Sequence, residues 1–490
     1  MKLRTTPRTM ICCAAFVAML CSCGRSHKQS PGPSLATTLD EVLNRLAHTG
    51  AVCSARVLDL QTGRELYAAK VDEPLMPASN LKLLTSAAAL DRFGAGHTFK
   101  TYLAIDGEDL WVIGTGDPGT GDPRIAAGSG RTPVSMFDDW ADALRKRGIS
   151  RFRGNLYYYD AALEPMWVHP SWHKDFLVEW FAAPTSGLNF NDNCIDISIT
   201  PTAAGQPVQF ELMPPVRNVQ IINKCLTGDT HSPQIVRAIG ANTITLTGSA
   251  STPARLESKP ITDPGAFFAD AFRTHLASRG IAVDGRAIRA ASPLDGTTPP
   301  PLDKVVAVHE TRLRDAIFRI NKQSQNFFAE AVCKLLGQGF EADQGRSAAG
   351  SWEAGRRAIH AFLRQHHIDD SRVVVADGSG LSRDNRATTR VLTDVLAAMY
   401  SHPSSNVFRD SLSVAGKDGS LAKRLTDLEG RVLGKPGYIA GVCSVSGYVR
   451  TSRGRWLGFA IIYNGGFGAD EKPFQLLQDE ACRILAEWAE

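Results

Sequence analysis

A chain of 490 residues with 43% hydrophobic and 21% charged residues has the composition of an ordinary globular protein, and its length predicts more than one domain. The formal net charge is +4, and loss of Lys2, Arg4 and Arg8 with a leader peptide would leave about +1. This balance excludes a protein that binds nucleic acid or an anionic membrane surface mainly through charge.

The N-terminus has the pattern of an export signal. Basic residues precede an apolar run that is too short to cross a membrane as a stable helix. The run ends at Leu20-Cys21-Ser22-Cys23-Gly24, which resembles a bacterial lipoprotein cleavage box with Cys23 as the lipidated residue. Cys21 is unusual in its position, so simple secretion is the alternative. We therefore predict a signal peptide over residues 1–23, a tether over 24–34, and a protein of the periplasm or cell envelope that meets the membrane only through a lipid anchor.

Cysteine and histidine spacing predicts neither a disulfide framework nor a metal centre. The later cysteines form no C-x-x-C pair, and Cys194 with Cys225 is the first pair to test for a disulfide. Two histidine pairs lack a third ligand at useful spacing: His169 with His173, and His366 with His367. We expect no metal and no cofactor.

The first hundred residues alternate between helical and strand patterns. Helical spacing runs from Leu35 to a terminating Gly50, and two alternating segments follow at 51–60 and 64–70. An Ala/Leu-rich run without internal Gly or Pro then predicts a helix that opens near Ser79 and ends near Phe93.

From about Thr101 to Pro300 the pattern changes to short strands with frequent turns. One helix is expected within them, from Pro264 to Ser278, with Asp263 as its N-cap. We therefore predict an inserted, mostly-β region over 101–300 that forms two subdomains.

After Pro301 the chain is again rich in helices. Helices are expected over 313–336, 351–366, 389–400 and 473–488, and strands over 432–439, 443–451 and 455–463. Hairpins and helices at both ends predict one antiparallel sheet shared by the two termini. The expected fold class is therefore α/β of the α+β type, with a main domain formed by 35–100 and 301–490.

Ser79 and Lys82 form the first candidate catalytic pair. They are three residues apart, so on a helix they lie on one face about one turn from each other. A serine hydroxyl needs a base, and a lysine serves as that base only when burial or a neighbouring cation keeps it partly neutral. The alternative is that Ser79 is an N-cap or a small core residue. The same spacing recurs at Ser171–Lys174 and Ser420–Lys423.

Two later patterns carry polar groups that suit a cleft. Ser324 and Asn326 are two residues apart, which fits a short turn between helices, where the serine relays a proton and the amide holds a substrate. Lys435 precedes Gly437 on an expected strand, where a cation orients a carboxylate and lowers the pKa of Lys82. Each pattern is weak alone, because Ser404–Asn406 and Lys417–Gly419 also match.

A glycine pattern at 114–119 matches G-x-G-x-x-G after a strand but does not predict a nucleotide site. Asp117-Pro118 and Asp122-Pro123 stand where a helix would have to open.

The order of the three polar patterns resembles the motif set of the penicilloyl serine transferases. The resemblance narrows to one branch through Asp377 to Arg386, Val414 to Leu421 and Gly441 to Val449, with Gly116-Asp117-Pro118 and Gly187 to Asn193 in the insert. That branch is the D-alanyl-D-alanine carboxypeptidase/endopeptidase family, the class C low-molecular-mass penicillin-binding proteins. The resemblance covers nearly everything from Leu35 to Glu490 and implies a transpeptidase/β-lactamase-like domain with flanking helices, interrupted by an insert.

The resemblance also implies roles for single residues. Ser79 would be the acylated nucleophile and Lys82 its base, Ser324 would pass the proton to the leaving amine, and Asn326 and Lys435 would position the substrate. Further substrate contacts are expected from four residues: Gly437, Tyr438, Ser420 and Asp160. The backbone N–H groups of Ser79 and Tyr438 would form the oxyanion hole. Asp160 would meet the amino end of the peptide stem.

Pro436 departs from the third motif, which normally has Thr or Ser between its Lys and Gly. The missing hydroxyl would normally grip the terminal carboxylate, and proline also removes a backbone donor, which is tolerated at a strand edge.

The resemblance predicts an exported serine-type D-Ala-D-Ala carboxypeptidase and endopeptidase that cleaves peptidoglycan stem peptides and is acylated by β-lactams. One alternative is a non-catalytic or impaired peptidoglycan-binding relative, which Pro436 makes possible. A β-lactamase, which shares the nucleophile, is a second alternative. The motifs of the branch and the insert argue against it.

Overall fold

The computed structural model describes residues 34–290, 298–465 and 470–489. The expected signal peptide, nearly all of the expected tether and the lipidation site at Cys23 lie outside these residues. Within the described ranges, no helix combines the length and the apolar character that crossing a membrane requires.

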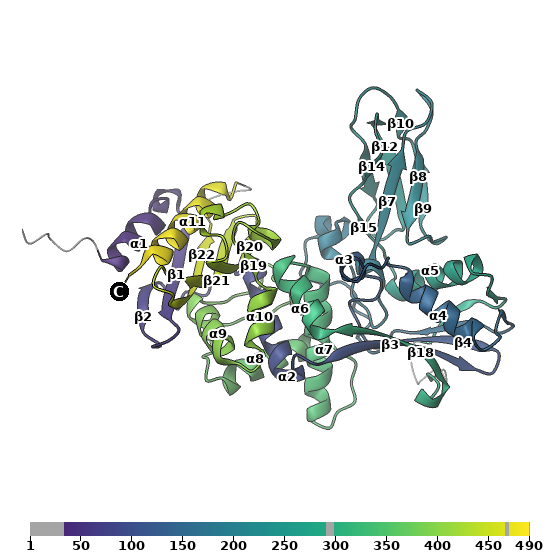
Figure 1. Cartoon of the computed structure of the whole chain (residues 1–490), viewed down its shortest axis with the longest axis horizontal. Coiled ribbons are helices and arrows are strands. Elements are labelled where there is room, and N and C mark those ends of the chain that lie inside the picture. Colours follow the sequence, from purple (N-terminus) through teal and green to yellow (C-terminus); the bar gives the residue numbers. More distant parts are fainter. Residues whose placement is uncertain (1–33, 291–297, 466–469, 490) are drawn as a thin grey trace, which may run out of the picture. The chain divides into compact units, whose positions relative to one another are not determined.

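Strands from both ends of the chain form one antiparallel sheet (Figure 1). The N-terminal hairpin supplies β1 (Val52–Asp59) and β2 (Glu65–Ala69). The C-terminal part supplies β19 (Ser413–Val414), β20 (Val432–Ile439), β21 (Val442–Arg450) and β22 (Trp456–Asn464). The order β19-β20-β21-β22-β1-β2 joins the two ends through β1 and β22. The sheet shared by both termini is therefore confirmed.

Helices cover both faces of this sheet. α1 (Leu35–Leu43) and α11 (Lys472–Glu487) pack on one face, in a core that includes Ile461. α9 (Thr389–Ser401) packs on the other face, in the core that includes Ile462. Because both faces are covered, β21 and β22 are buried at almost every position, which explains their nearly continuous apolar sequences.

α2 (Lys82–Phe93) is the buried centre of the helical layer. Its residues from Lys82 to Leu90 are all buried, and Gly94 ends the helix with a φ of 75°. The helices around it are α6 (Leu313–Lys322), α7 (Asn326–Asp343), α8 (Trp352–Gln365) and α10 (Ser405–Ser411). The segment expected to be helical from 313 to 336 is thus two helices with a break at residues 323–325.

A second sheet is formed largely by residues of the expected insert. Its order is β17-β6-β4-β3-β18. The strands are β3 (Thr98–Asp106), β4 (Asp109–Gly114), β6 (Leu156–Tyr159), β17 (Ala287–Arg289) and β18 (Val305–Arg312). β18 follows the expected boundary at residue 300 but pairs with β3 along most of its length. The boundaries at residues 100 and 300 stay predictions.

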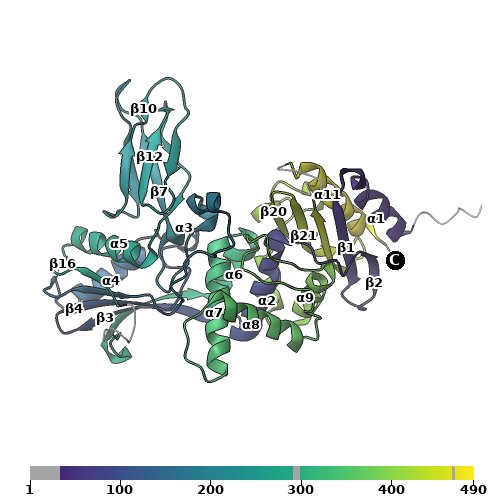
Figure 2. The ribbon, with the colours of Figure 1, turned by 180° about the vertical axis from the view of Figure 1, so that it is seen from behind.

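The insert has more helix than the sequence predicts. α5 (Pro264–Ser278) begins as expected, with the Asp263 carboxylate accepting from the backbone N–H of Ala266. α4 (Ser135–Arg145) was not expected, and it lies beside α5 (Figure 2). The two helices pack around a cluster of aromatic rings. These rings are Phe137, Trp140, Phe190, Phe268 and Phe272.

A short helix, α3 (Pro123–Gly128), opens where the sequence was expected to exclude one. Asp122 caps it by accepting from the backbone N–H groups of Arg124 and Ile125. The proline at its first position, which we interpreted as a break, is compatible with a helix start because that N–H has no partner in any helix. The Asp122 carboxylate therefore already binds the backbone N–H groups at the N-terminus of α3.

The remaining strands of the insert form small sheets. β7 (Cys194–Thr200) pairs with β8 (Gln209–Met213), β14 (Ala254–Arg255) and β15 (Lys259–Pro260). β12 (Thr243–Thr247) pairs with β9 (Gln220–Asn223) and β11 (Gln234–Arg237). Two-stranded pairs join β10 (Leu226–Thr227) to β13 (Ser249–Ala250) and β5 (Arg151–Phe152) to β16 (Ala282–Val283). Cys194 and Cys225 are both buried and unbonded, so the first pair that we would test for a disulfide is not one in this structure.

Candidate active site

Ser79 and Lys82 lie at the start of α2, on the face that their spacing predicts. Ser79 belongs to a 3₁₀ turn, Ala78–Leu81, that runs directly into the helix, and Lys82 is the first residue of α2. The Nζ of Lys82 lies 2.9 Å from the Oγ of Ser79. Ser79 is partly exposed, whereas Lys82 is fully buried. The serine is therefore accessible from solvent while its neighbouring amine is shielded from water.

The amine of Lys82 has three acceptors and two buried carboxylates near it. Besides Ser79, its Nζ donates to Asn326 Oδ1 at 2.6 Å and to the Ser379 carbonyl at 2.8 Å. Burial lowers the pKa of Lys82 to about 7, against the opposing charges of Glu330 and Asp377. A lysine with this pKa is partly neutral near pH 7 and can accept a proton from Ser79.

Ser324 lies in the break between α6 and α7, as predicted. Its φ of 56° is in the left-handed region, which a non-glycine residue adopts only when its surroundings hold it there. The Oγ of Ser324 donates to the Oγ of Ser79 at 3.1 Å. The next residue, Gln325, donates to Asp192 at 2.8 Å, and Asn326 donates to the carbonyl of Phe181 at 2.8 Å. Both partners belong to the insert, so the insert holds this turn.

Lys435 approaches Ser324 from β20. Its Nζ donates to Ser324 Oγ at 2.9 Å and to the Pro436 carbonyl at 2.6 Å. The sequence predicts that Lys435 lowers the pKa of Lys82, but burial is the main cause there. Burial and the charge of Lys82 both lower the pKa of Lys435, and this repulsion between the two amines is mutual. Lys435 is therefore placed to pass a proton to Ser324.

The strand edge at Pro436 and Gly437 faces Ser79. β19 pairs only with Gly434 and Leu433, so Pro436 has a strand neighbour on one side, as its missing N–H requires. A Cβ on Gly437 would lie 2.8 Å from the backbone nitrogen of Ser79, so a side chain cannot fit there. The absence of a side chain lets β20 approach the backbone nitrogen of Ser79 closely at Gly437.

The sequence analysis does not identify two buried carboxylates near Lys82, those of Glu330 and Asp377. Glu330 accepts from Trp352 Nε1 at 2.6 Å and from the backbone N–H groups of Gly378 and Ser379 at 2.8 and 2.9 Å. Burial and the neighbouring Asp377 raise the pKa of Glu330 to about 7. The sequence does contain a signal for Glu330, because it is the one charged residue in the apolar run from Phe327 to Val332. A carboxylate in such a run is buried and must have polar partners.

The second of these carboxylates, Asp377, organises the loop after it. It accepts from Trp172 Nε1 at 2.8 Å and from the backbone N–H groups of Gly380 and Ser382 at 2.8 and 2.6 Å. This loop carries the Ser379 carbonyl that binds Lys82.

Asp160 and Ser420 lie outside the group around Ser79. The Asp160 carboxylate is nearly buried and is already engaged, by Arg289 at 3.2 Å and by Ser186 Oγ at 3.3 Å. Ser420 is exposed and lies 2.9 Å from the Oγ of Ser413, next to the edge of β20. Neither residue makes a direct hydrogen bond to any other candidate site residue that the structure describes.

The competing serine pattern at Ser171 leads elsewhere. Its Oγ lies 2.8 Å from His169 Nδ1 and 2.6 Å from Ser382 Oγ. Within the described residues, the Nζ of Lys174 makes no hydrogen bond to Ser171, so this serine has no lysine base.

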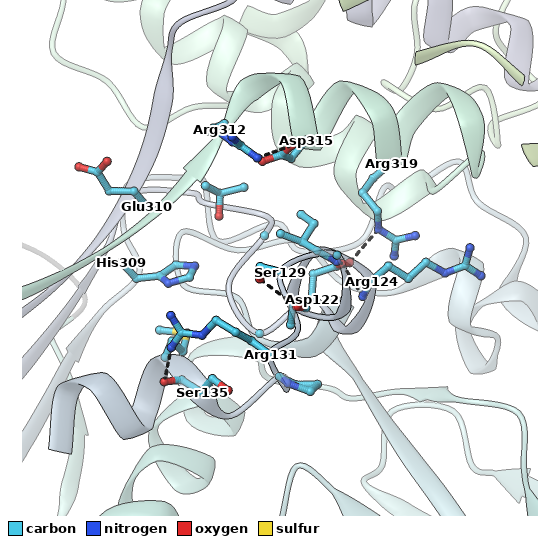
Figure 3. A pocket seen from close by; sticks show the side chains of 18 of the residues that line it. Asp122, Arg124, Ser129, Arg131, Ser135, His309, Glu310, Arg312, Asp315 and Arg319 are labelled. Carbon is cyan, nitrogen blue, oxygen red and sulfur yellow. Dashed lines mark hydrogen bonds and ion pairs between the residues drawn. The ribbon is translucent and has the colours of Figure 1, made fainter. Parts of the chain in front are cut away.

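A groove lies beside the candidate site, along α6 and α3. Three cavities of about 880, 490 and 410 Å³ are all lined by Arg124 and by Gln323, the residue before Ser324. Figure 3 shows the largest of them, between β18, α3 and α6. The cavities therefore lie beside the turn of Ser324, although Ser79, Lys82, Ser324 and Lys435 do not line them.

Taken together, these contacts can carry out acyl transfer. Ser79 is a hydroxyl nucleophile with a neutralisable amine on one side and a second hydroxyl–amine pair, Ser324 and Lys435, on the other.

Comparison with known proteins gives one family and a consistent fold. Residues 35–484 match the D-Ala-D-Ala carboxypeptidase 3 (S13) family. The chain is 31% identical over 483 residues to a D-alanyl-D-alanine carboxypeptidase of Actinomadura sp. (strain R39), covering 93% of this chain and 85% of the relative. It is 22% identical over 418 residues to the D-alanyl-D-alanine carboxypeptidase DacB of Haemophilus influenzae, covering 80% and 81% of the two chains.

The fold is similar to the crystal structure of penicillin binding protein 4 from Haemophilus influenzae. The TM-score is 0.73 at 20% identity, over 91% of this chain and 99% of the other. The same protein in complex with a β-lactam gives a TM-score of 0.68 at 20% identity, over 91% and 100% of the two chains. The expected fold class, a transpeptidase/β-lactamase-like arrangement of antiparallel sheet and helices, is confirmed by this likeness.

Proposed function

This chain belongs to the D-Ala-D-Ala carboxypeptidase 3 (S13) family, as its motifs predict, and from that premise we propose that it is a serine-type D-Ala-D-Ala carboxypeptidase and endopeptidase acting on peptidoglycan stem peptides. The observation that carries the proposal is the position of Ser79 Oγ, 2.9 Å from Lys82 Nζ and 3.1 Å from Ser324 Oγ.

In the proposed acylation, Ser79 Oγ attacks the carbonyl carbon of the penultimate D-alanine and Lys82 takes the hydroxyl proton. The backbone N–H groups of Ser79 and Tyr438 stabilise the oxyanion. Ser324 delivers a proton to the leaving amine, so that the C–N bond breaks and a Ser79 ester forms. The proton that Ser324 gives up is replaced from Lys435, which donates to it at 2.9 Å. Asn326 fixes the amine of Lys82 and positions the substrate.

A water molecule then hydrolyses the ester and restores Ser79. We propose that β-lactams acylate the same serine, because the amide of the drug meets the same nucleophile and the same oxyanion donors. Support comes from the family and from the β-lactam complex described for the Haemophilus influenzae relative.

The alternative of an impaired or non-catalytic relative rests on Pro436, which cannot supply the hydroxyl that the third motif normally offers. The complete contact set of Ser79, Lys82, Ser324 and Lys435 favours an enzyme over this alternative, because a binding protein would not need a buried lysine with a pKa of about 7. Family membership favours a peptidase over a β-lactamase.

We further propose that the protein is exported and anchored through Cys23, and that residues 35–100 with 301–490 form the catalytic domain around the insert 101–300. Gly437, Tyr438, Ser420 and Asp160 are proposed substrate contacts. For Asp160, the amino end of the stem would have to compete with Arg289 for the carboxylate.

Hydrolysis of two substrates tests the proposed function. Purified wild type is incubated with a D-Ala-D-Ala-ending stem peptide and with a cross-linked peptide dimer, and released D-alanine and monomer are measured. We expect hydrolysis of at least one substrate by wild type and by a Ser171→Ala control, and none by Ser79→Ala. Wild type without hydrolysis of either substrate would overturn the proposal.

A further inference from the structure

The order of the substrate contacts along β20 indicates how a bound substrate is oriented. Gly437 lies against the backbone nitrogen of Ser79, where the carbonyl oxygen of the scissile bond would be held. Two residues earlier, Lys435 meets Ser324, which would protonate the leaving amine. The leaving group therefore extends from the scissile bond toward the Lys435 end of the strand.

Past Lys435, this direction leads into the groove beside α6. Gly434 pairs with Ser413, whose Oγ lies 2.9 Å from the Oγ of Ser420. Ser420 in turn lines the cavity of about 410 Å³ together with Arg124. Ser420 therefore links the Lys435 end of β20 to a cavity that Arg124 also lines.

Arg124 differs from most arginines along this groove in having no ion pair. Arg319 is bound to Asp122 at 2.8 Å, Arg312 to Asp315 at 2.7 Å, and Arg131 to Asp139. Arg124 is exposed, and no carboxylate of the described residues lies within ion-pair distance of its guanidinium. Figure 3 shows its side chain extending away from Asp122, the residue to which Arg319 is joined.

The third motif, Lys435-Pro436-Gly437, lacks a group that would hold the substrate carboxylate, so a cation from outside the motif can take this role. Pro436 has no hydroxyl to hold a carboxylate. Lys435 is already engaged with the Oγ of Ser324 and with the carbonyl of Pro436. An arginine guanidinium keeps its charge at every working pH and presents a fork that fits a carboxylate.

We propose that Arg124 binds the carboxylate of the leaving group, on the carbon that bears the leaving amine, and so determines which substrates are cleaved. This inference rests on the proposed function. Two leaving groups carry a carboxylate in this position: the C-terminal D-alanine of an uncross-linked stem and the diamino acid of a cross-link. The adjoining cavity of about 880 Å³ is in the size range of sites that bind whole small ligands, so it leaves room for a second stem.

The test compares Arg124→Ala and Arg124→Lys with a matched control, Arg314→Ala. Arg314 is also exposed and lines the largest cavity, but it does not line the cavity with Ser420. Each variant is assayed on a D-Ala-D-Ala-ending peptide, on the same peptide with a C-terminal amide, and on a cross-linked dimer. Thermal unfolding of each variant checks the fold.

For Arg124→Ala we expect kcat/KM on the free-acid peptide to fall about 10- to 100-fold, the range for losing one charge-assisted hydrogen bond. On the amide the fall should stay below about threefold, because the amide has no charge to lose. Arg124→Lys should lie between wild type and alanine, and Arg314→Ala should match wild type. A loss on the dimer as well would identify the diamino acid as a second source of the carboxylate.

Equal losses on the acid and the amide would overturn the inference, since they would show an effect unrelated to the carboxylate. Unchanged kcat/KM in Arg124→Ala, with wild type active and Ser79→Ala inactive, would also overturn it and leave the proposed function standing. Absence of all wild-type hydrolysis would overturn both.

Discussion

The carboxylate of Glu330 lies 2.9 Å from the backbone nitrogen of Ser379 and accepts its hydrogen bond. The carbonyl of Ser379 accepts from Lys82 Nζ at 2.8 Å, so one residue connects the buried acid to the candidate base. The carboxylate also raises the pKa of Lys82, against the lowering that burial causes. We interpret Glu330 as a positioning residue that acts through Lys82.

Removing this charge should move the pH profile of acylation downward. In wild type, acylation requires neutral Lys82, so the rate should rise with pH around a midpoint of about 7. Glu330→Gln removes a negative charge that stabilises protonated Lys82, so the pKa of Lys82 falls and the midpoint moves to lower pH. Asp377 and Lys435 also face this amine and are unchanged in the variant.

The measurement is the second-order rate constant of penicillin acylation from pH 5 to 9. Because Glu330 itself has a pKa of about 7, the wild-type curve should be broader than a single titration and the variant curve sharper. An unchanged or upward-shifted midpoint would contradict the assigned coupling.

Arg319 joins the turn of Ser324 to the insert. Its guanidinium is almost fully buried and binds Asp122 at 2.8 Å and Asp192 at 2.7 Å, and Asp192 also accepts from Gln325. Arg319→Gln would leave the buried carboxylate of Asp122 and the mostly buried carboxylate of Asp192 without their cation, which costs about 3–5 kcal/mol for a pair of this kind. We expect that loss in the free energy of unfolding, measured in urea.

The control for Arg319→Gln is Arg312→Gln, at the last residue of β18, directly before α6. The side chain of Arg312 is mostly exposed and its pair with Asp315 is solvated, so its removal should cost no more than about 1 kcal/mol. Equal stability of the two variants would show that the buried cluster does not hold the insert to α6.

Pro436→Thr should restore the missing hydroxyl of the third motif. We expect kcat/KM on a D-Ala-D-Ala-ending peptide to rise by up to about 10- to 100-fold, and penicillin acylation to improve as well. Substrates with internal cross-links should gain less, because other contacts are available to them. If Arg124 compensates for the missing hydroxyl, Arg124→Ala should cost less in the Pro436→Thr background. Equal rates of wild type and Pro436→Thr on both substrates would contradict this interpretation of Pro436.

The lipid anchor at Cys23 is tested on the mature protein. Mass spectrometry of the N-terminal peptide from a bacterial membrane fraction should show a diacylated or triacylated cysteine, and Cys23→Ala should move the protein to the soluble fraction. An unmodified N-terminus beyond Cys23 would indicate ordinary secretion.

The sequence predicts best what depends on short spacing. The i, i+3 relation of Ser79 and Lys82 and the turn at Ser324 follow from local geometry, and both are found. The partners of Lys82 at Ser379 and Glu330 come from segments some 300 and 250 residues away, and no local pattern specifies such contacts. The burial that lowers the pKa of Lys82 and of Lys435 likewise comes from the fold and has no local pattern in the sequence.

Two helices of the insert, α4 and α3, are not predicted although the sequence contains a signal for each. In the insert, the apolar residues of α4 recur at helical spacing, from Met136 through Trp140 to Leu144, yet no helix was expected there. Asp122-Pro123 was interpreted as a break although an Asx cap followed by proline is typical of a helix start.

The most direct measurement is the location of the acyl group after reaction with penicillin. The protein is trapped as its penicilloyl adduct, digested, and mapped by mass spectrometry, with Ser79→Ala treated in parallel. We expect the added mass on the peptide that contains Ser79 and no adduct in the variant. An adduct on Ser171 or Ser420, or labelling that survives in Ser79→Ala, would contradict the assignment of Ser79 as the nucleophile.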